Sequence, residues 1–249
     1  MILIKSAGEI EIMASAGRIC ALALEAVKGI IAPGISTKEI EKFAHDLIKK
    51  EGGQPAFLGY RGYPAAVCVS INEQVVHGIP TGRKLREGDI ASVDLGVYYK
   101  GFYGDAAKTF AVGEVSPEAR KLMRVTEESL DLGISRAVAG ARLSDISHAI
   151  QTHAEENGFS VVRSFVGHGI GRALHEEPQV PNFGPPGKGP RLLRGMALAI
   201  EPMVNAGSWK VRVLGDGWTA VTEDGRLSAH YEHTVIVDEG QPSVLTRLS

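Results

Sequence analysis

The chain has 249 residues, of which 44% are hydrophobic and 22% are charged, and its formal net charge is -2. This composition is typical of a globular protein with one large core or two fused lobes, and it lacks the basic excess that binding to DNA or RNA uses. No stretch reaches the ~18 apolar residues of a membrane span. We therefore expect a cytoplasmic protein with no membrane or DNA partner, and the two cysteines, Cys20 and Cys68, do not indicate a disulfide framework.

Helix signals come first along the chain. Ser6 and Glu9 form a capping-box pattern, and apolar residues then recur at spacings of three and four, which predicts an amphipathic helix to about Val27. The same signals, with Pro117 at the start of the second of them, predict three further helices, over about 36–52, 116–130 and 144–158.

The predicted helices form two similar pairs. Gly34 and Gly52 bracket the second helix as Gly140 and Gly158 bracket the fourth, and strand-rich sequence follows each pair. The pattern predicts a single domain, 1–249, with two similar halves of about 1–112 and 113–249. Few residues are identical between the halves, so chance similarity of helix ends is the alternative.

Between the two helix pairs, the stretch from Ile90 to Val112 alternates in residue type and turns near residues 99–101, which predicts a β-hairpin. In a tight hairpin, Asp94 and Asp105 lie opposite or diagonal on one face, about 5 to 8 Å apart. Two facing carboxylates repel each other unless a cation lies between them, so the pair hints at a metal. The alternative is that Asp94 is a solubility residue at a strand edge and Asp105 a turn residue.

Three further residues extend this pattern. Glu201 in "MALAIEPMV" and Glu232 in "SAHYEHTVIV" are predicted inside apolar strands, where glutamates are rare unless they are paired or bound to a metal. His168 stands in the glycine frame "VGHGIG", which something must approach closely. Carboxylate oxygens with an imidazole suit Mn, Fe, Co or Zn ions. Four carboxylates exceed the need of one ion, so two divalent ions that activate a water for hydrolysis are predicted.

In this order and these sequence frames, the five residues resemble the type I methionine aminopeptidases, which remove the initiator methionine from new proteins. The likeness extends from about Ile4 to about Val237. It implies a pita-bread fold, an α/β (α+β) architecture in which two αβ halves, related by a pseudo-twofold axis, combine a curved antiparallel sheet with outer helices. It also implies a monomeric aminopeptidase that acts on nascent peptides whose second residue is small and contacts the ribosome transiently.

The resemblance assigns each site residue a role. Asp94 binds one ion through both oxygens, His168 and Glu201 bind the other, and Asp105 and Glu232 bridge the two. Glu201 also serves as the general base.

Two further histidines are carried over from the family. His77 matches the histidine that binds substrate beside the scissile bond, and His175 matches the one that hydrogen-bonds the substrate carbonyl and its tetrahedral intermediate. The predicted methionine pocket consists of Phe57, Tyr60, Tyr63, Cys68, Leu174 and Trp218. For Phe57 and Cys68, an ordinary place in the core is the alternative.

The sequence departs from the family pattern at three positions. Leu174 stands where relatives often have phenylalanine, which predicts a looser pocket, and Gly96 and Ala106 replace hydroxyl residues that often support the aspartates, which predicts altered metal affinity. Glu176 and Glu177 belong to the matching frame, but nothing in the sequence gives them a chemical role. The rival hypotheses are a proline-directed aminopeptidase or prolidase, and a non-catalytic protein of the same fold that binds partners or RNA.

Overall fold

The computed structural model describes residues 2–248. Its helices confirm the four predicted from the sequence, to within a few residues at each end, and a short 3-10 helix, η1, is added. The helices are α1 (Ala7–Lys28), α2 (Thr37–Lys50), η1 (Tyr60–Gly62), α3 (Pro117–Ser135) and α4 (Leu143–Glu156). The strands of the main sheet are β1 (Gln54–Pro55), β2 (Cys68–Ile71), β4 (Ile90–Tyr99), β5 (Phe102–Ala111), β7 (Gly167–Gly169), β8 (Glu176–Val180), β9 (Ala197–Ile200), β14 (Glu232–Ile236) and β15 (Ser243–Val244).

The main sheet is antiparallel and runs in the order β1-β4-β5-β14-β9-β7-β8, with β2 paired to β4 and β15 to β14. Strands from before and after residue 112 meet at its centre, where β5 pairs with β14. Two three-stranded sheets complete the fold: one consists of β6 (Ser160–Val161), β10 (Met203–Asn205) and β13 (Ser228–His230), and the other of β3 (Gln74–Val76), β11 (Val211–Val213) and β12 (Ala220–Thr222).

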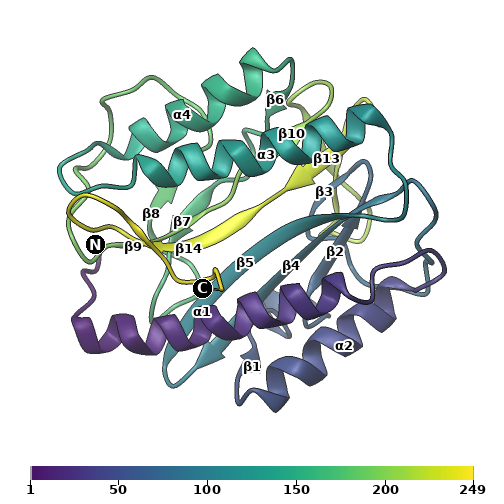
Figure 1. Cartoon of the computed structure of the whole chain (residues 1–249), viewed down its shortest axis with the longest axis horizontal. Coiled ribbons are helices and arrows are strands. Elements are labelled where there is room, and N and C mark those ends of the chain that lie inside the picture. The colour runs from purple at the N-terminus through teal and green to yellow at the C-terminus, as the bar shows by residue number, and fades with distance from the viewer. Residues whose placement is uncertain (1, 249) are drawn as a thin grey trace.

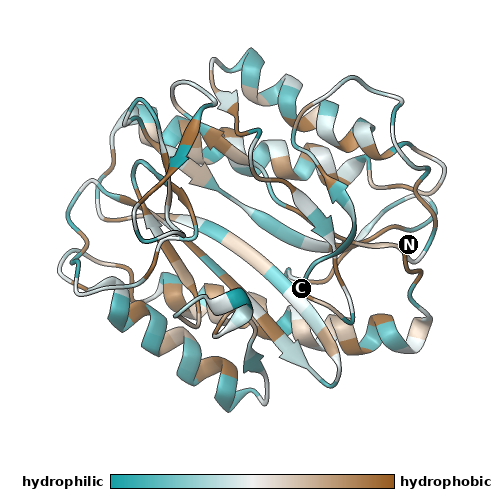
Figure 2. Ribbon diagram, turned by 180° about the vertical axis from the view of Figure 1, so that it is seen from behind, coloured by the Kyte–Doolittle hydropathy of each residue, from teal (hydrophilic) through white to brown (hydrophobic). Residues whose placement is uncertain are grey.

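The two helix pairs cover the same face of the sheet, with α1 and α2 over one half and α3 and α4 over the other (Figure 1). Local sequence explains where the first pair begins, because Ser6 and Ser36 each complete a capping box with the glutamate three residues later. Seen from behind, the strands lie in front of the helices, and hydrophilic and hydrophobic residues alternate along α2 at the lower left (Figure 2). Helix α2 therefore buries one side against the sheet.

The apolar core lies between these helices and the sheet. Ile40 and Ile48 of α2 belong to one buried cluster that reaches strands β2, β4 and β5. Ile146 and Ile150 of α4 belong to a second cluster that reaches α3, β9 and β14. All four side chains are fully buried, which stabilises the fold by ~1.5–3 kcal/mol for each. Both helix layers are thus fixed against the strands that carry the candidate site.

The predicted hairpin is confirmed. Strands β4 and β5 are joined by Lys100 and Gly101, which both have positive φ, as a tight two-residue turn requires. Asp94 pairs with Ala107 and Gly96 with Asp105, so the two aspartates are diagonal neighbours on one face. No helix among residues 2–248 is long and apolar enough to cross a membrane.

Candidate metal centre

One cavity of about 150 Å³ collects every residue predicted for the site. It opens on the face of the sheet opposite the helices' core clusters, and side chains from the hairpin, β7, β14 and several loops reach it. Arg61, which the sequence reasoning did not single out, also lines it. The predicted residues that line it are Phe57, Tyr60, Tyr63, Cys68, His77, Asp94, Asp105, His168, Leu174, His175, Glu201, Trp218 and Glu232.

The floor of the cavity is formed by carboxylate oxygens and an imidazole nitrogen that lie close together, from Asp105, His168, Glu201 and Glu232. One atom each from Asp105, His168 and Glu232 lies within 4.8 Å of the others, and all three residues are buried. His168 Nε2 is 3.5 Å from Glu201 Oε1 and 4.0 Å from Asp105 Oδ2. Asp94 and Glu232 both pair with Ala107, from opposite sides of β5, so this small residue separates the two carboxylates.

Glu201 lies just outside the strand in which it was predicted. Strand β9 ends at Ile200, and Glu201 occupies the break before β10 begins at Met203. The prediction of a strand-interior position was therefore wrong by one residue, because the alternation continues past the last ladder pair, between Ile200 and His233. The Asn182 side-chain amide donates to the Glu201 carbonyl at 3.0 Å and holds this break in place.

Electrostatics make the four carboxylates unstable as free anions. Burial raises the pKa of Asp94, Glu201 and Glu232 well above the ordinary range, and repulsion among the neighbouring carboxylates raises it further. Burial also raises the pKa of Asp105, to about 7. Positive charge placed among these groups would remove both the desolvation penalty and the repulsion.

The protonation state of His168 suits a metal ligand, because its ring is neutral rather than positively charged. Burial lowers its pKa to about 4, so the ring is neutral near pH 7. Its Nδ1 lies 2.9 Å from the Gly169 carbonyl, which can only accept, so Nδ1 carries the proton and Nε2 keeps its lone pair. That lone pair faces the carboxylates.

The donor set fits divalent cations. Asp94 Oδ1, Asp105 Oδ1 and Glu232 Oε1 are buried oxygens that have no hydrogen-bond partner within residues 2–248. Buried oxygens of this kind are costly unless something binds them. Hard oxygen donors with one neutral imidazole are a ligand set for Mn, Fe, Co or Zn ions. The residues present are therefore suited to hold the metal predicted from the sequence.

The close approach expected at the glycines around His168 is made by neighbouring backbone. A Cβ on Gly167 would lie 2.4 Å from the Ala199 carbonyl oxygen, and a Cβ on Gly169 would lie 2.2 Å from that of Glu177. Backbone of neighbouring strands, rather than an ion, thus approaches these glycines. They allow β7 to lie close between β8 and β9 and so fix the backbone from which the imidazole projects.

Two further histidines line the cavity beside the group of ligand-type atoms. The His175 ring is 4.2 Å from that of His168 between centroids, and its Nδ1 is hydrogen-bonded to the Tyr60 hydroxyl at 2.8 Å. His77 has a positive φ of 60°, a strained backbone of the kind often found at functional sites, and its ring packs edge-on against Phe165. Burial lowers the pKa of His77.

Aromatic residues form the wall beside these histidines. The Tyr63 and Trp218 rings meet edge to face at 5.2 Å, and the Tyr63 hydroxyl donates to the Gly78 carbonyl at 3.0 Å. A Cβ on Gly96 would lie 2.7 Å from Phe57 Cε1. The glycine at position 96 therefore makes room for the Phe57 ring, a packing reason for this departure that the sequence comparison could not reveal.

Sequence reasoning missed a histidine beside Glu201. His230 is 1% exposed, and its Nε2 lies 3.7 Å from Glu201 Oε2, without a hydrogen-bond partner among residues 2–248. Its position two residues before Glu232 was a signal, because alternate residues of a strand share a face. In the structure His230 ends β13, where it pairs with Met203, just after the break that contains Glu201. Thr234 was missed as well: its hydroxyl accepts from the Asp105 N–H at 2.9 Å.

Comparison with known proteins identifies relatives over the whole chain. The sequence model of metallopeptidase family M24 matches residues 11–239. Methionine aminopeptidase 1 of Bacillus subtilis (strain 168) is 54% identical over 248 residues, which cover 100% of each chain. The chain belongs to the methionine aminopeptidases of metallopeptidase family M24. The methionine aminopeptidase of Clostridium perfringens is also 54% identical, over 246 residues that cover 99% of each chain.

Solved structures agree with this membership. The crystal structure of a methionine aminopeptidase from Thermotoga maritima matches with a TM-score of 0.98 and 51% identity, and the match covers 100% of each chain. The prolidase from Pyrococcus furiosus has the same fold at a TM-score of 0.81 and 22% identity, with 99% of this chain and 66% of that one covered. The pita-bread fold, the family resemblance and the metallo-aminopeptidase class predicted from the sequence are thereby confirmed.

Proposed function

We propose that this metallo-aminopeptidase removes the N-terminal methionine from nascent proteins whose second residue is small, with two divalent ions as cofactors. The observation that carries the proposal is the one cavity in which three buried carboxylates, the partly buried Glu201 and a neutral imidazole share their lining with aromatic residues. Asp94 and Asp105 with Glu232, and His168 with Glu201, would hold the ions. When bound, the ions supply water activation and polarise the carbonyl of the first peptide bond.

The protein's own residues then have distinct tasks. Glu201 takes the proton from the attacking water and passes it to the leaving amine, and its second oxygen faces His230. His175 donates to the substrate carbonyl oxygen as negative charge develops there. When the Tyr60 hydroxyl donates to His175 Nδ1, the proton of the neutral ring resides on Nε2, where a donor is needed. His77 lies beside the scissile bond.

The apolar side of the cavity selects the first residue of the substrate. A methionine thioether gains from contacts with aromatic rings such as those of Tyr63, Trp218 and Phe57. Leu174 and Cys68 complete this wall, and a leucine in place of a larger ring leaves the pocket wider. We further propose that the protein acts in the cytoplasm as a monomer, within one domain of two similar halves, and meets its substrates by transient contact with the ribosome.

Removal of metal should abolish the activity. Protein treated with a chelator is expected to be inactive, and added cobalt, manganese or iron should restore activity as the bound metal approaches two ions per chain, because the buried carboxylates need two cations to neutralise them. Elemental analysis beside peptide hydrolysis measures both. Glu232→Gln should lower the stoichiometry, whereas Glu177→Gln, at an exposed position, should not. Full activity of the metal-free protein would exclude the proposal.

Substrate preference separates this function from its closest rival. Peptides that begin Met-Gly, Met-Ala, Met-Ser or Met-Thr should be cleaved, and those that begin Met-Leu, Met-Lys or Met-Glu should not, because the second residue must fit between His77 and the metal floor. Mass spectrometry of a mixture of these peptides measures the preference. Efficient cleavage of X-Pro dipeptides, with X other than Met, would favour a proline-directed enzyme. Binding without any cleavage would favour a non-catalytic protein.

A further inference from the structure

Glu176, which had no role in the sequence, is the most fully bonded carboxylate near the site. Its Oε2 pairs with Lys5 Nζ at 2.6 Å, and the two side chains are only 8% and 2% exposed. Its Oε1 accepts from the backbone N–H of Arg172 at 2.7 Å and of Ala173 at 3.2 Å. One buried carboxylate therefore joins the N-terminal segment to the start of the loop 171–176.

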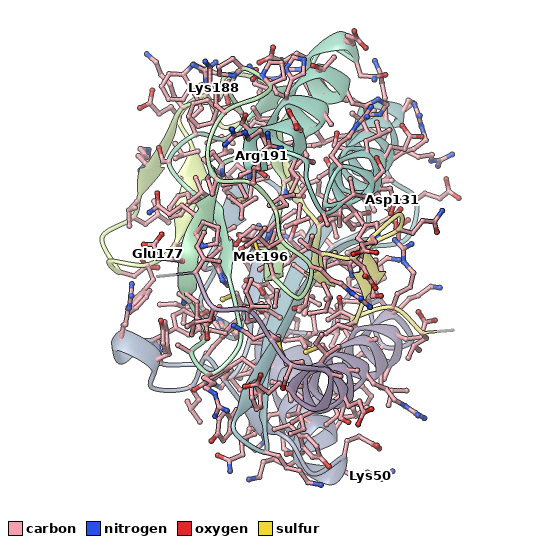
Figure 3. The ribbon with its side chains drawn as sticks, turned by 90° about the vertical axis from the view of Figure 1, so that its left-hand side faces the viewer. Lys50, Asp131, Glu177, Lys188, Arg191 and Met196 are labelled. Atoms are coloured by element: carbon pink, nitrogen blue, oxygen red, sulfur yellow. The ribbon has the colours of Figure 1, made fainter. Side chains whose placement is uncertain are left out.

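The same loop is held at Gly171. A Cβ there would lie 2.3 Å from Lys5 Cε, so the lysine stem lies against the glycine, and the Gly171 carbonyl accepts from the Tyr103 N–H at 2.8 Å. Figure 3 shows the purple N-terminal segment beside the green ribbon near Glu177, which is labelled. The contact links residues 171 positions apart in the sequence.

This loop carries two of the residues proposed to act on substrate, Leu174 and His175. His175 is exposed at the mouth of the cavity, and its one hydrogen bond within residues 2–248 joins it to the Tyr60 hydroxyl. Its ring also stacks on the Tyr60 ring at 5.2 Å between centroids and lies 4.2 Å from the His168 ring, and both contacts require the backbone at residue 175 to be correctly placed. The placement of the imidazole over His168 thus depends on the shape of the loop below it.

We propose that the buried Lys5–Glu176 pair is a positioning device, which holds the loop 171–176 so that His175 and Leu174 face the substrate. The inference rests on the function proposed above. A buried ion pair is often no more stabilising than apolar residues of the same size, because desolvation of both charges offsets their attraction. This pair instead fixes the position of the loop. The Glu176 carboxylate holds the amides of Arg172 and Ala173, and the Lys5 ammonium holds that carboxylate in place.

The test removes the pair without leaving an unpaired buried charge. The double variant Lys5→Met/Glu176→Met should retain both metal ions and lose about 10- to 100-fold in kcat, the scale of a small misplacement of a catalytic group. Lys5→Met/Glu176→Gln keeps an oxygen for the two loop amides and should recover part of that loss. Glu177→Gln, a matched change at the exposed neighbour, should match the wild type.

Two readouts distinguish positioning from general stability. Combined with His175→Ala, the Met/Met change should cause no further loss in kcat, because its effect passes through that histidine. Hydrogen exchange at the Arg172 and Ala173 amides should be faster in both double variants, and this readout requires no activity. A wild type that cleaves no methionyl peptide would refute the proposed function, and the exchange rates would still test the loop.

The proposal would be overturned by wild-type kcat and wild-type exchange in Lys5→Met/Glu176→Met, or by a loss in kcat that multiplies in full with that of His175→Ala. If the Met/Met variant does not fold, Lys5→Met/Glu176→Gln decides alone. Unchanged kcat together with unchanged exchange at Arg172 and Ala173 in that variant would show that the ion pair does not order the loop.

Discussion

Glu201→Gln is expected to lower kcat by roughly 100- to 10,000-fold, the range for loss of a general acid-base group, and to weaken binding of one metal ion. Glutamine keeps the shape of the side chain but cannot take the proton from water, and it removes the proposed anionic ligand 3.5 Å from His168 Nε2. Calorimetric metal titration beside steady-state kinetics measures both effects. Glu223→Gln, at an exposed position, is the matched control.

His175→Ala should have a different signature. Both ions are retained because every proposed metal ligand remains, while kcat falls by roughly 100-fold or more, the scale for removal of one donor to a developing oxyanion. His45→Ala, at a partly exposed position on α2, should leave both measurements unchanged. If His175→Ala lost metal and Glu201→Gln kept both ions and most activity, the two assignments would have to be exchanged.

Local sequence predicted the parts of the site that lie on regular structure. Asp94 and Asp105 were paired correctly because a two-residue turn sets the register of a hairpin, and the register sets which side chains share a face. The capping boxes at Ser6 and Ser36 placed the starts of two helices for the same reason, since each depends on contacts within four residues.

Contacts between distant segments could not be predicted in this way. The approach of His230 to Glu201 depends on the break between β9 and β10. The Lys5–Glu176 pair joins two segments that are 171 positions apart in the sequence. The glycines at 167 and 169 were recognised as sites of close approach, but the sequence does not say that neighbouring strands are what approaches. Such features arise from tertiary packing, and periodicity carries no information about them.

The pairing of β5 with β14 would give bound ions a part in the cooperativity of unfolding. Asp94 and Asp105 precede residue 112, whereas His168, Glu201 and Glu232 follow it, so ions held by both groups as proposed would bind only while β5 and β14 stay paired. A ligand that binds the closed state alone opposes every opening that separates its donors. Bound metal should therefore suppress independent opening of either half far more than fraying of a single helix, and so join two potential folding units into one.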